Sequence, residues 1–240
     1  TYLLAREDFD GRMRTTVNIC GPETGRTSTS KIKSPNRPTP YGLAFQTLTK
    51  HGDVGADLRC MFVPDPGYVF MEVDLSQAES RVVDILAKGN LFDGDRDVHC
   101  LTASWIYDKS YEEILKEYLS GIIYKRQLGK KVRHAGERGM KKRRLSQLAE
   151  VSEWRAGEIL RTFHRYSPNI EGVYFADIQV ALENDECTLI SGYGRRRQFY
   201  ERWGEEMFKE AYAQIPQADV SDHTKFAMVR IRKRIKPPDF

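Results

Sequence analysis

The sequence lacks the features that mark disulfide-stabilised, zinc-binding and membrane-spanning chains. Its four cysteines are scattered and form no Cys-x-x-Cys pair: Cys20, Cys60, Cys100 and Cys187. This spacing argues against a zinc site or a disulfide framework and suits a reducing compartment. No apolar run approaches the length of a membrane span, and the amino end lacks the shape of a signal peptide. Internal repeats and low-complexity segments are also absent, which excludes a repeat architecture.

The sequence has little net charge, so total charge is a weak argument for nucleic-acid binding. The 240 residues have a formal charge of +4, and 40% of them are hydrophobic and 30% charged. This composition is that of an ordinary globular protein with one good core or two smaller ones. The distribution is more informative, because ten Lys or Arg lie between Lys125 and Arg144 against one acid, Glu137. Such a cluster suits phosphates, although a solvated charged surface is the alternative.

The most informative segment spans residues 67–81. Tyr68–Val73 is apolar, aromatic and β-branched, which predicts a strand buried on most sides. Asp74 stands where this strand ends, and Ser76 is predicted to cap a helix over Gln77–Lys88. A carboxylate at the carboxyl end of a strand is well placed to bind a hard cation such as Mg²⁺. The alternative is that Asp74 only caps the turn.

A second pattern is a row of cations spaced four residues apart: Arg126, Lys130, His134 and Arg138. Residues at this spacing share one face of a helix, where like charges repel by roughly a few tenths of a kcal/mol per pair. A triphosphate would relieve this repulsion by supplying the missing anion. The predicted helix also contains residues that weaken it, as in an element that moves: Gly129, Gly136 and Gly139.

The rest of the chain predicts mixed secondary structure. Residues 1–50 are rich in Gly, Pro, Ser and Thr, which indicates loops with short strands. Residues 154–163 have the pattern of an amphipathic helix, and 188–199 that of a hairpin. Two further helices are predicted with a non-helical junction between them: 206–214 and 222–234. We therefore expect an α+β fold.

Together these segments resemble the family A DNA polymerases, the DNA polymerase I type. Asp74-Leu-Ser-Gln-Ala-Glu-Ser-Arg81 is similar to motif A of that family, Asp-Tyr-Ser-Gln-x-Glu-x-Arg. Arg126–Gly139 resembles motif B, Arg-x-x-x-Lys-x-x-x-(aromatic)-x-x-x-Tyr-Gly, and His at the aromatic position suggests a phage-like member. Further similar segments extend the resemblance over nearly the whole chain: Thr24-Gly-Arg-Thr-Ser28, Asp97-Val-His-Cys-Leu-Thr-Ala103, Thr188–Phe199 and Lys225-Phe-Ala-Met228.

The resemblance implies a catalytic role for Asp74. It also makes Asp74 and Leu75 the expected metal-binding positions for two Mg²⁺ ions, which Mn²⁺ can replace. Glu79 would exclude the ribose 2′-hydroxyl of the incoming nucleotide. The other expected nucleotide-binding residues are Gln77, His99, Arg126, Lys130 and His134. For His99, a purely structural role at a helix start is the alternative.

The resemblance also implies residues that contact primer–template DNA: Arg26, Gln46, Arg138, Arg195, Arg197 and Gln217. Two positions depart from the family pattern. Ala44 stands where an Asn is expected before Gln46, and Arg138 stands where the family has a Tyr that stacks at the templating site. The second change could alter fidelity or nucleotide choice without removing the grip on phosphate. A solvated loop is the alternative for residues 195–197.

The implied fold is the polymerase right hand, with an antiparallel palm sheet and mostly helical fingers. Residues 1–90 would form part of the palm, 91–185 the fingers, and 186–240 the return to the palm. The implied activity is that of a DNA-directed DNA polymerase acting in replication, which adds deoxynucleotides to a primer 3′-end by two-metal-ion catalysis. Motif C, His-Asp-Glu, is missing from the sequence. We therefore expect a fragment that is inactive by itself.

Two other functions stay open. A single-subunit RNA polymerase shares the palm and a similar Arg-x-x-x-Lys helix, but Glu79 would have no use in a site that accepts ribose. An inactive nucleic-acid-binding remnant would explain Arg138 and the missing motif. The expected partners are primer–template DNA and deoxynucleoside triphosphates, with a processivity factor or a helicase as further candidates. No membrane partner is expected, and the expected location is the cytoplasm of a bacterial or phage-infected cell, at DNA.

Overall fold

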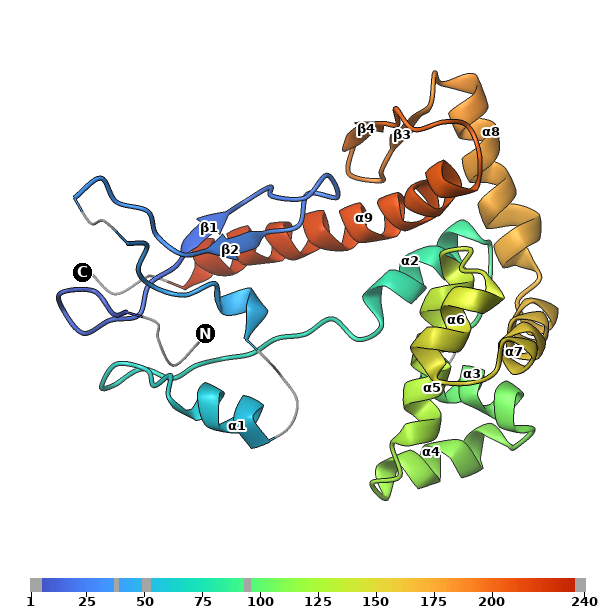
Figure 1. Ribbon diagram of the computed structural model, residues 1–240, viewed down its shortest axis with the longest axis horizontal. Coiled ribbons are helices and arrows are strands. Elements are labelled where there is room, and N and C mark those ends of the chain that lie inside the picture. Colours follow the sequence, from blue (N-terminus) through green and yellow to red (C-terminus); the bar gives the residue numbers. More distant parts are fainter. Residues whose placement is uncertain (1–5, 37–38, 49–52, 93–95, 236–240) are drawn as a thin grey trace. The chain divides into compact units, whose positions relative to one another are not determined.

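The computed structural model describes residues 6–36, 39–48, 53–92 and 96–235, and its chain forms two compact units, Thr1–Leu75 and Ser76–Phe240. Figure 1 shows the elements of both units. Helices dominate the described residues and are accompanied by small antiparallel sheets, so the expected α+β class is confirmed. The functional division at residues 90 and 185 stays a prediction.

The first unit consists mainly of loops with short regular elements, as the sequence predicted. Strand β1 (Thr16–Asn18) pairs antiparallel with β2 (Ser28–Ser30). A 3₁₀ turn at Phe45–Thr47 and helix α1 (Asp53–Cys60) follow.

The predicted buried strand over Tyr68–Val73 is wrong. The segment belongs to neither of the two-stranded sheets found among the described residues. Its apolar side chains are 69–86% exposed at Val69, Phe70, Met71 and Val73. An extended segment becomes a buried strand only when a neighbouring strand pairs with its backbone and another layer covers its side chains. The described part of the chain supplies no such neighbour.

The second unit is mostly helical. Its regular elements are α2 (Ala78–Leu86), α3 (Val98–Tyr107), α4 (Tyr111–Leu119), α5 (Tyr124–Glu137), α6 (Lys142–Ala149), α7 (Glu153–Tyr166), α8 (Ala176–Asn184), β3 (Thr188–Ile190), β4 (Arg196–Gln198) and α9 (Glu205–Arg234). A π-helical segment, Ile170–Phe175, leads into α8. Strands β3 and β4 form the predicted hairpin, and β3 packs against α9 (Figure 1). No helix within the described ranges combines the length and the apolar character needed to cross a membrane.

Side-chain caps explain where several of these helices begin. Asp97 precedes α3, and its carboxylate accepts hydrogen bonds from the backbone N–H groups of His99 and Cys100, both at 2.9 Å. Ser110 begins α4 through a capping box with Glu113. Each cap satisfies N–H groups that the first turn of a helix leaves unpaired.

The predicted start of α2 needs correction. Helix α2 begins at Ala78 and ends at Leu86, and the residue at its N-cap is Gln77 rather than Ser76. Gln77 has a left-handed backbone, with φ of 54°, and makes no capping hydrogen bond with its side chain. Its carboxamide oxygen instead accepts a hydrogen bond from the Val98 N–H at 2.7 Å. The side chain therefore satisfies the first turn of α3.

Glycines allow α5 to lie close to its neighbours. A Cβ at Gly129 would lie 2.2 Å from the His99 carbonyl oxygen, and one at Gly136 would lie 2.1 Å from Cε1 of Phe163. Both distances are too short for any side chain. Close packing therefore explains these glycines, which the sequence pattern linked to helix mobility.

The main apolar core of the second unit lies among α5, α7, the π-helical segment, α8 and α9. Several of its members are almost completely buried: Val132, Phe163, Tyr174, Leu182 and Met207. A smaller cluster joins α3 to α4 through Cys100, Ala103 and Ile114.

The predicted break between helices 206–214 and 222–234 is wrong, because α9 continues from Glu205 to Arg234 with Pro216 inside it. The nitrogen of a proline carries no hydrogen, so Pro216 leaves the carbonyl of Tyr212 without its helical partner. The hydroxyl of Tyr174 donates a hydrogen bond to that buried carbonyl. Pro216 is itself buried, so packing and this replacement hydrogen bond let the helix continue.

We predict that Tyr174→Phe lowers the free energy of unfolding by about 1–3 kcal/mol, because the buried Tyr212 carbonyl then has no donor. In a Pro216→Ala background, the restored N–H can bond to this carbonyl, so the same substitution should have a clearly smaller effect. Urea unfolding followed by circular dichroism measures both values. Tyr200→Phe, at an exposed tyrosine, is the control. Equal losses in the two backgrounds would contradict the proposed pairing.

A buried ion pair within α5 also contacts α3. Arg133 is 1% exposed, and its guanidinium carbon lies 5.3 Å from the centre of the Trp105 ring and 5.0 Å from that of Phe163. Its Nε donates to the Thr102 hydroxyl at 3.0 Å, and its Nη1 lies 3.6 Å from Oε1 of Glu137. Burial lowers the pKa of Arg133, and the Glu137 carboxylate acts in the opposite direction.

Arg133→Met should destabilise the protein by about 3–5 kcal/mol, because it leaves the Glu137 charge buried without its partner. Adding Glu137→Leu should recover most of this loss by removing that charge. The exposed pair Lys209–Glu205 has the same i,i+4 spacing, and Lys209→Met should cost only about 0–1 kcal/mol. Chemical unfolding compares the three variants. A double variant no more stable than Arg133→Met would refute this account.

Candidate nucleotide and DNA site

Of the four cations predicted to share one helical face, three lie on α5 and the fourth lies just beyond it. Arg126, Lys130 and His134 belong to the helix, while Arg138 follows its last residue with φ of −110° and ψ of 12°. Lys130, His134 and Arg138 line a pocket of about 280 Å³. Arg126 lies outside this pocket. The end of α5 therefore separates Arg138 from the other three cations of the predicted row.

Arg126 has a partner within the protein. Its Nε and Nη2 both donate to Oδ2 of Asp97, at 3.0 and 2.8 Å, and its guanidinium lies 4.5 Å from the centre of the Tyr118 ring. Burial acts to raise the pKa of Asp97, but the Arg126 hydrogen bond and backbone N–H donors hold it below its usual value. Asp97 thus caps α3 and, through Arg126, also connects α3 to α5. Arg126 is balanced by this carboxylate without an added anion.

Lys130 differs from Arg126 in its surroundings. Its side chain is exposed, and no carboxylate pairs with it among the residues that the structure describes. His134 lies at the same pocket, with its Nδ1 3.8 Å from Oε2 of Glu137. An exposed ammonium beside a pocket can bind a phosphate group without first breaking an internal ion pair.

His99 is buried at the start of α3, where it packs against His134 with ring centres 5.5 Å apart. Burial, followed by the nearby His134, lowers the pKa of His99 to about 3. The ring is therefore neutral at physiological pH. Its Nδ1 is also buried and makes no hydrogen bond within the described structure. These surroundings favour the structural role for His99, and its contact with a nucleotide stays a prediction.

Glu79 is joined to Arg138, an interaction that the sequence did not predict. Nη2 of Arg138 lies 2.5 Å from Oε2 of Glu79, which lies in the first turn of α2. The next residue, Ser80, donates a hydrogen bond from its hydroxyl to Glu137 at 3.0 Å. Two consecutive residues of α2 are therefore bound to two consecutive residues at the end of α5.

Arg133 and Glu137 were missed as site residues by sequence reasoning. Both lie beneath the pocket face of α5, and Glu137 links the buried Arg133 to Ser80 of α2. The available signal was the i,i+4 spacing of a cation and the only acid in the basic segment, which is the spacing of a helical ion pair. Burial of this pair could not be read from that spacing.

The predicted DNA-binding residues of the hairpin are attached to α9. Arg195 donates from Nε and Nη2 to the two carboxylate oxygens of Asp222, at 3.0 and 2.7 Å. Arg197 donates to Oε1 of Gln214 at 2.9 Å. Gln217 belongs to the same helix and is partly exposed. The hairpin and α9 thus bring these residues together.

The remaining predicted residues belong to the first unit. Gly25 has φ of 74°, and a tight turn from Pro22 to Gly25 leads to the exposed Arg26. Gln46 donates from Nε2 to the Thr27 hydroxyl at 3.0 Å, which ties the 3₁₀ turn to the loop that carries Arg26. The two predicted DNA contacts of this unit are therefore neighbours in the fold.

Asp74 and Leu75 are exposed at the end of the first unit. Across the described ranges, no three His, Cys, Asp or Glu residues come together as a metal site would require. A catalytic metal site needs several oxygen ligands, and Asp74 is a single carboxylate. The described residues therefore supply part of a metal site at most.

Known proteins resemble this chain over nearly its full length. The model of the family described as DNA polymerase family A matches residues 2–239. A DNA polymerase I of Caldicellulosiruptor bescii is 23% identical over 251 residues, covering 98% of this chain and 26% of that protein. A DNA polymerase I of Chloroflexus aurantiacus is 31% identical over 139 residues, covering 52% of this chain and 14% of its own length. The chain thus spans about a quarter or less of these relatives.

A solved structure shares the fold. It is described as the POL domain of Pol1 from M. smegmatis in complex with DNA primer-template and dNTP. The two chains align with a TM-score of 0.75 and 22% identity, over 95% of this chain and 39% of the other. With the family match over residues 2–239, this agreement in fold confirms the resemblance drawn from the sequence motifs. The chain belongs to DNA polymerase family A.

Proposed function

We propose that the protein containing this chain carries out template-directed DNA synthesis, transferring deoxynucleotides from their triphosphates to a primer 3′-end. Family membership supports the reaction class. The observation that carries the proposal is the arrangement at the end of α5. There the exposed Lys130 and Arg138 line one pocket, and Arg138 is paired with Glu79 of α2. A cation for phosphate and a fixed carboxylate for the sugar then lie on adjoining elements.

We assign the triphosphate chiefly to Lys130. Its ammonium can approach a phosphate directly, whereas Arg126 must share its guanidinium with Asp97. Arg126 can still contribute, because a guanidinium has five N–H donors and Asp97 engages only two of them. His134 would pack against the nucleotide from the next turn of α5. The carboxamide oxygen of Gln77 already accepts a hydrogen bond from α3, so the side chain would contact a nucleotide through its Nε2 donors.

We assign discrimination against ribose to Glu79, held in place by Arg138. A carboxylate that excludes a hydroxyl sterically must stay in one position, and an ion pair restricts its movement. This role for Arg138 adds to its predicted contact with DNA. It also argues against the rival RNA polymerase, which has to accept the 2′-hydroxyl.

Asp74 is our proposed catalytic carboxylate and, with Leu75, this chain's contribution to binding two Mg²⁺ ions, which Mn²⁺ can replace. Such ions activate the primer hydroxyl and stabilise the leaving pyrophosphate when bound. One carboxylate does not form a complete site, so we assign no step of the reaction to a metal held by this chain alone.

Primer–template DNA is the proposed macromolecular partner. The hairpin arginines and Gln217 on α9 would contact one part of the duplex, and Arg26 with Gln46 another. A processivity factor or a helicase is a further proposed partner. Action at DNA in the cytoplasm and a role in replication complete the proposal.

In the full-length protein, Lys130→Ala should reduce kcat/KM for deoxynucleotides by roughly ten- to hundred-fold, because it removes a charge-assisted phosphate contact. Affinity for primer–template should hardly change. Single-nucleotide extension and duplex-binding titrations measure the two quantities. Lys116→Ala on α4 is the control for loss of one lysine charge. A loss of duplex affinity as large as the loss of kcat/KM would move Lys130 from the nucleotide to the DNA.

Glu79→Ala should raise the use of ribonucleotides relative to deoxynucleotides, because it opens space for the 2′-hydroxyl. Arg138→Ala should change the ratio of kcat/KM values in the same direction, but less, since Glu79 remains present and loses only its anchor. The double variant should resemble Glu79→Ala alone, because the two residues act as a pair. A sugar ratio unaffected by Arg138→Ala would show that the ion pair has no part in selection.

A further inference from the structure

Asp97 uses its two carboxylate oxygens for separate contacts. Oδ1 accepts the hydrogen bonds from the His99 and Cys100 N–H groups that cap α3, both at 2.9 Å. Oδ2 accepts from Nε and Nη2 of Arg126 on α5, at 3.0 and 2.8 Å. Capping a helix requires only one side-chain oxygen. The contact with Arg126 is therefore an addition to the cap, and the proposed reaction gives it no role so far.

Neighbouring helices also fix the position of this carboxylate. The Asp97 N–H donates to the hydroxyl of Tyr111, the first residue of α4, at 3.1 Å. The next N–H, that of Val98, donates to Oε1 of Gln77 at the start of α2, at 2.7 Å. The Asp97 side chain is only 18% exposed, so the surrounding atoms restrict it further. Asp97 is therefore a rigid acceptor, held through its backbone and through both oxygens.

The guanidinium of Arg126 is held on one edge and on one face. Asp97 takes the side edge, formed by Nε and Nη2, and the guanidinium carbon lies over the Tyr118 ring, 4.5 Å from its centre. A planar guanidinium has a second fork at its end, formed by Nη1 and Nη2. No carboxylate other than Asp97 pairs with Arg126 among the residues that the structure describes. The end fork suits two oxygens of a phosphate group.

The end fork of Arg126 and the Lys130 ammonium belong to one electrostatic environment. Burial is the main reason that the pKa of His99 falls to about 3, and the charges of His134, Arg126 and Lys130 contribute to this fall. Arg126 and Lys130 are one turn apart on α5, which places their Cβ atoms roughly 5–6 Å from each other. One triphosphate can bridge this separation.

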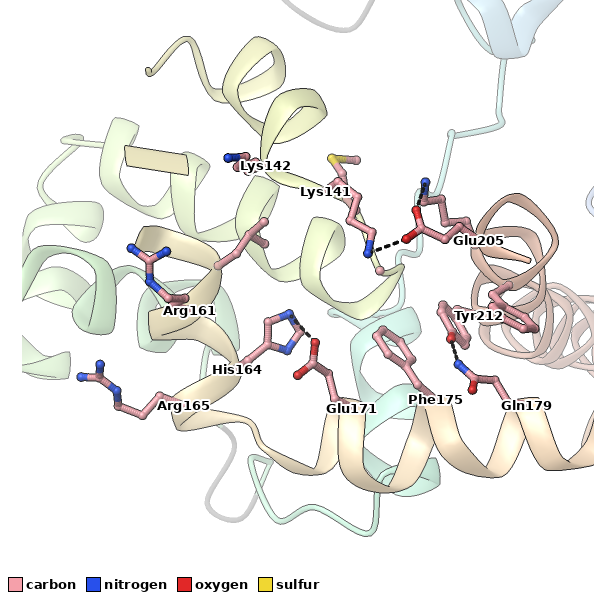
Figure 2. A pocket seen from close by; sticks show the side chains of 15 residues that line it. Lys141, Lys142, Arg161, His164, Arg165, Glu171, Phe175, Gln179, Glu205 and Tyr212 are labelled. Atoms are coloured by element: carbon pink, nitrogen blue, oxygen red, sulfur yellow. Dashed lines mark hydrogen bonds and ion pairs between the residues drawn. The ribbon is translucent and has the colours of Figure 1, made fainter. Parts of the chain in front are cut away.

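Helix α5 does not need the Asp97–Arg126 contact to keep its place. The buried Arg133 holds its middle. Gly139, two residues beyond its end, packs so closely on Tyr212 that a Cβ there would lie 3.1 Å from Cε2 of the ring. Tyr212 stacks on Phe175 with ring centres 3.8 Å apart, at the wall of a pocket of about 740 Å³ (Figure 2). What the contact with Asp97 supplies is the orientation of the guanidinium.

We propose that Asp97 is a positioning residue for nucleotide binding, which holds Arg126 so that its end fork is presented to the triphosphate of the incoming deoxynucleotide. The inference rests on the proposed function. A free arginine side chain loses rotamer freedom when it binds a ligand, which weakens binding by roughly tenfold. Asp97 removes most of this loss, because Arg126 already has one orientation before the nucleotide arrives.

Asp97→Asn separates the cap from the positioning. The Asn carboxamide oxygen replaces the capping oxygen, and its NH₂ group then faces Arg126 as a second donor. In the full-length protein, we expect KM for deoxynucleotides to rise roughly five- to tenfold and kcat to stay within about twofold. A loss of folded protein lowers the apparent kcat and leaves KM unchanged. Asp108→Asn, at the exposed other end of α3, is the control for one lost negative charge.

Arg126→Ala removes the group that Asp97 positions. In this background, Asp97→Asn should raise KM by less than about twofold, because the two residues act as a pair. Tyr118→Leu removes the ring against Arg126 and leaves the cap of α3 intact. It should also raise KM, and again only while Arg126 is present. This variant keeps the test valid if Asp97→Asn folds poorly.

Equal rises in KM in the two backgrounds, or no rise in either, would overturn the proposal. A fall in KM in Asp97→Asn would overturn it too, by showing that Asp97 competes with the triphosphate for Arg126. Calorimetric titration of the full-length variants with deoxyadenosine triphosphate repeats the comparison without catalysis. If the wild-type protein extends no primer but its affinities follow the expected pattern, the polymerase proposal fails and the positioning role stands. Absence of triphosphate binding to the wild-type protein would refute both.

Discussion

The second unit depends on keeping one guanidinium inside a helical core. Arg133 is surrounded by two aromatic rings, the Thr102 hydroxyl and the Glu137 carboxylate, so its charge is shared among three helices. A buried charge is tolerated only where fixed partners replace water. This requirement fixes the positions of α3, α5 and α7 more closely than apolar contacts could, because apolar contacts have no direction.

Because Arg133 fixes α5, it also helps to fix the residues at the end of α5 that are proposed to contact the nucleotide. Glu137 holds Ser80, and the residues beside them, Arg138 after Glu137 and Glu79 before Ser80, form a second ion pair. The two pairs are neighbours, so a shift of α5 relative to α2 would strain both of them together. Selection of the sugar and contact with the triphosphate would then be mechanically coupled through one helix end.

The sequence predicted the elements that local signals determine. The hairpin over residues 188–199 and the helix containing Lys130 follow from alternation and spacing. The errors arise where distant residues decide the outcome. Pro216 predicts a break, but the hydroxyl of Tyr174 from another segment satisfies the carbonyl that the proline leaves unpaired. The row of cations predicts four side chains available to phosphate, but Asp97 and Glu79 form ion pairs with the two cations at its ends.

The exposed segment Tyr68–Val73 has a consequence for handling the protein. Its backbone has no strand partner among the described residues, and its apolar side chains face outward. An unpaired edge of this kind is a template for another chain, since intermolecular strand pairing would satisfy the backbone and cover the apolar surface at once. A preparation of the chain by itself should therefore tend to self-associate as its concentration rises. The aggregates would begin at the segment that leads to Asp74.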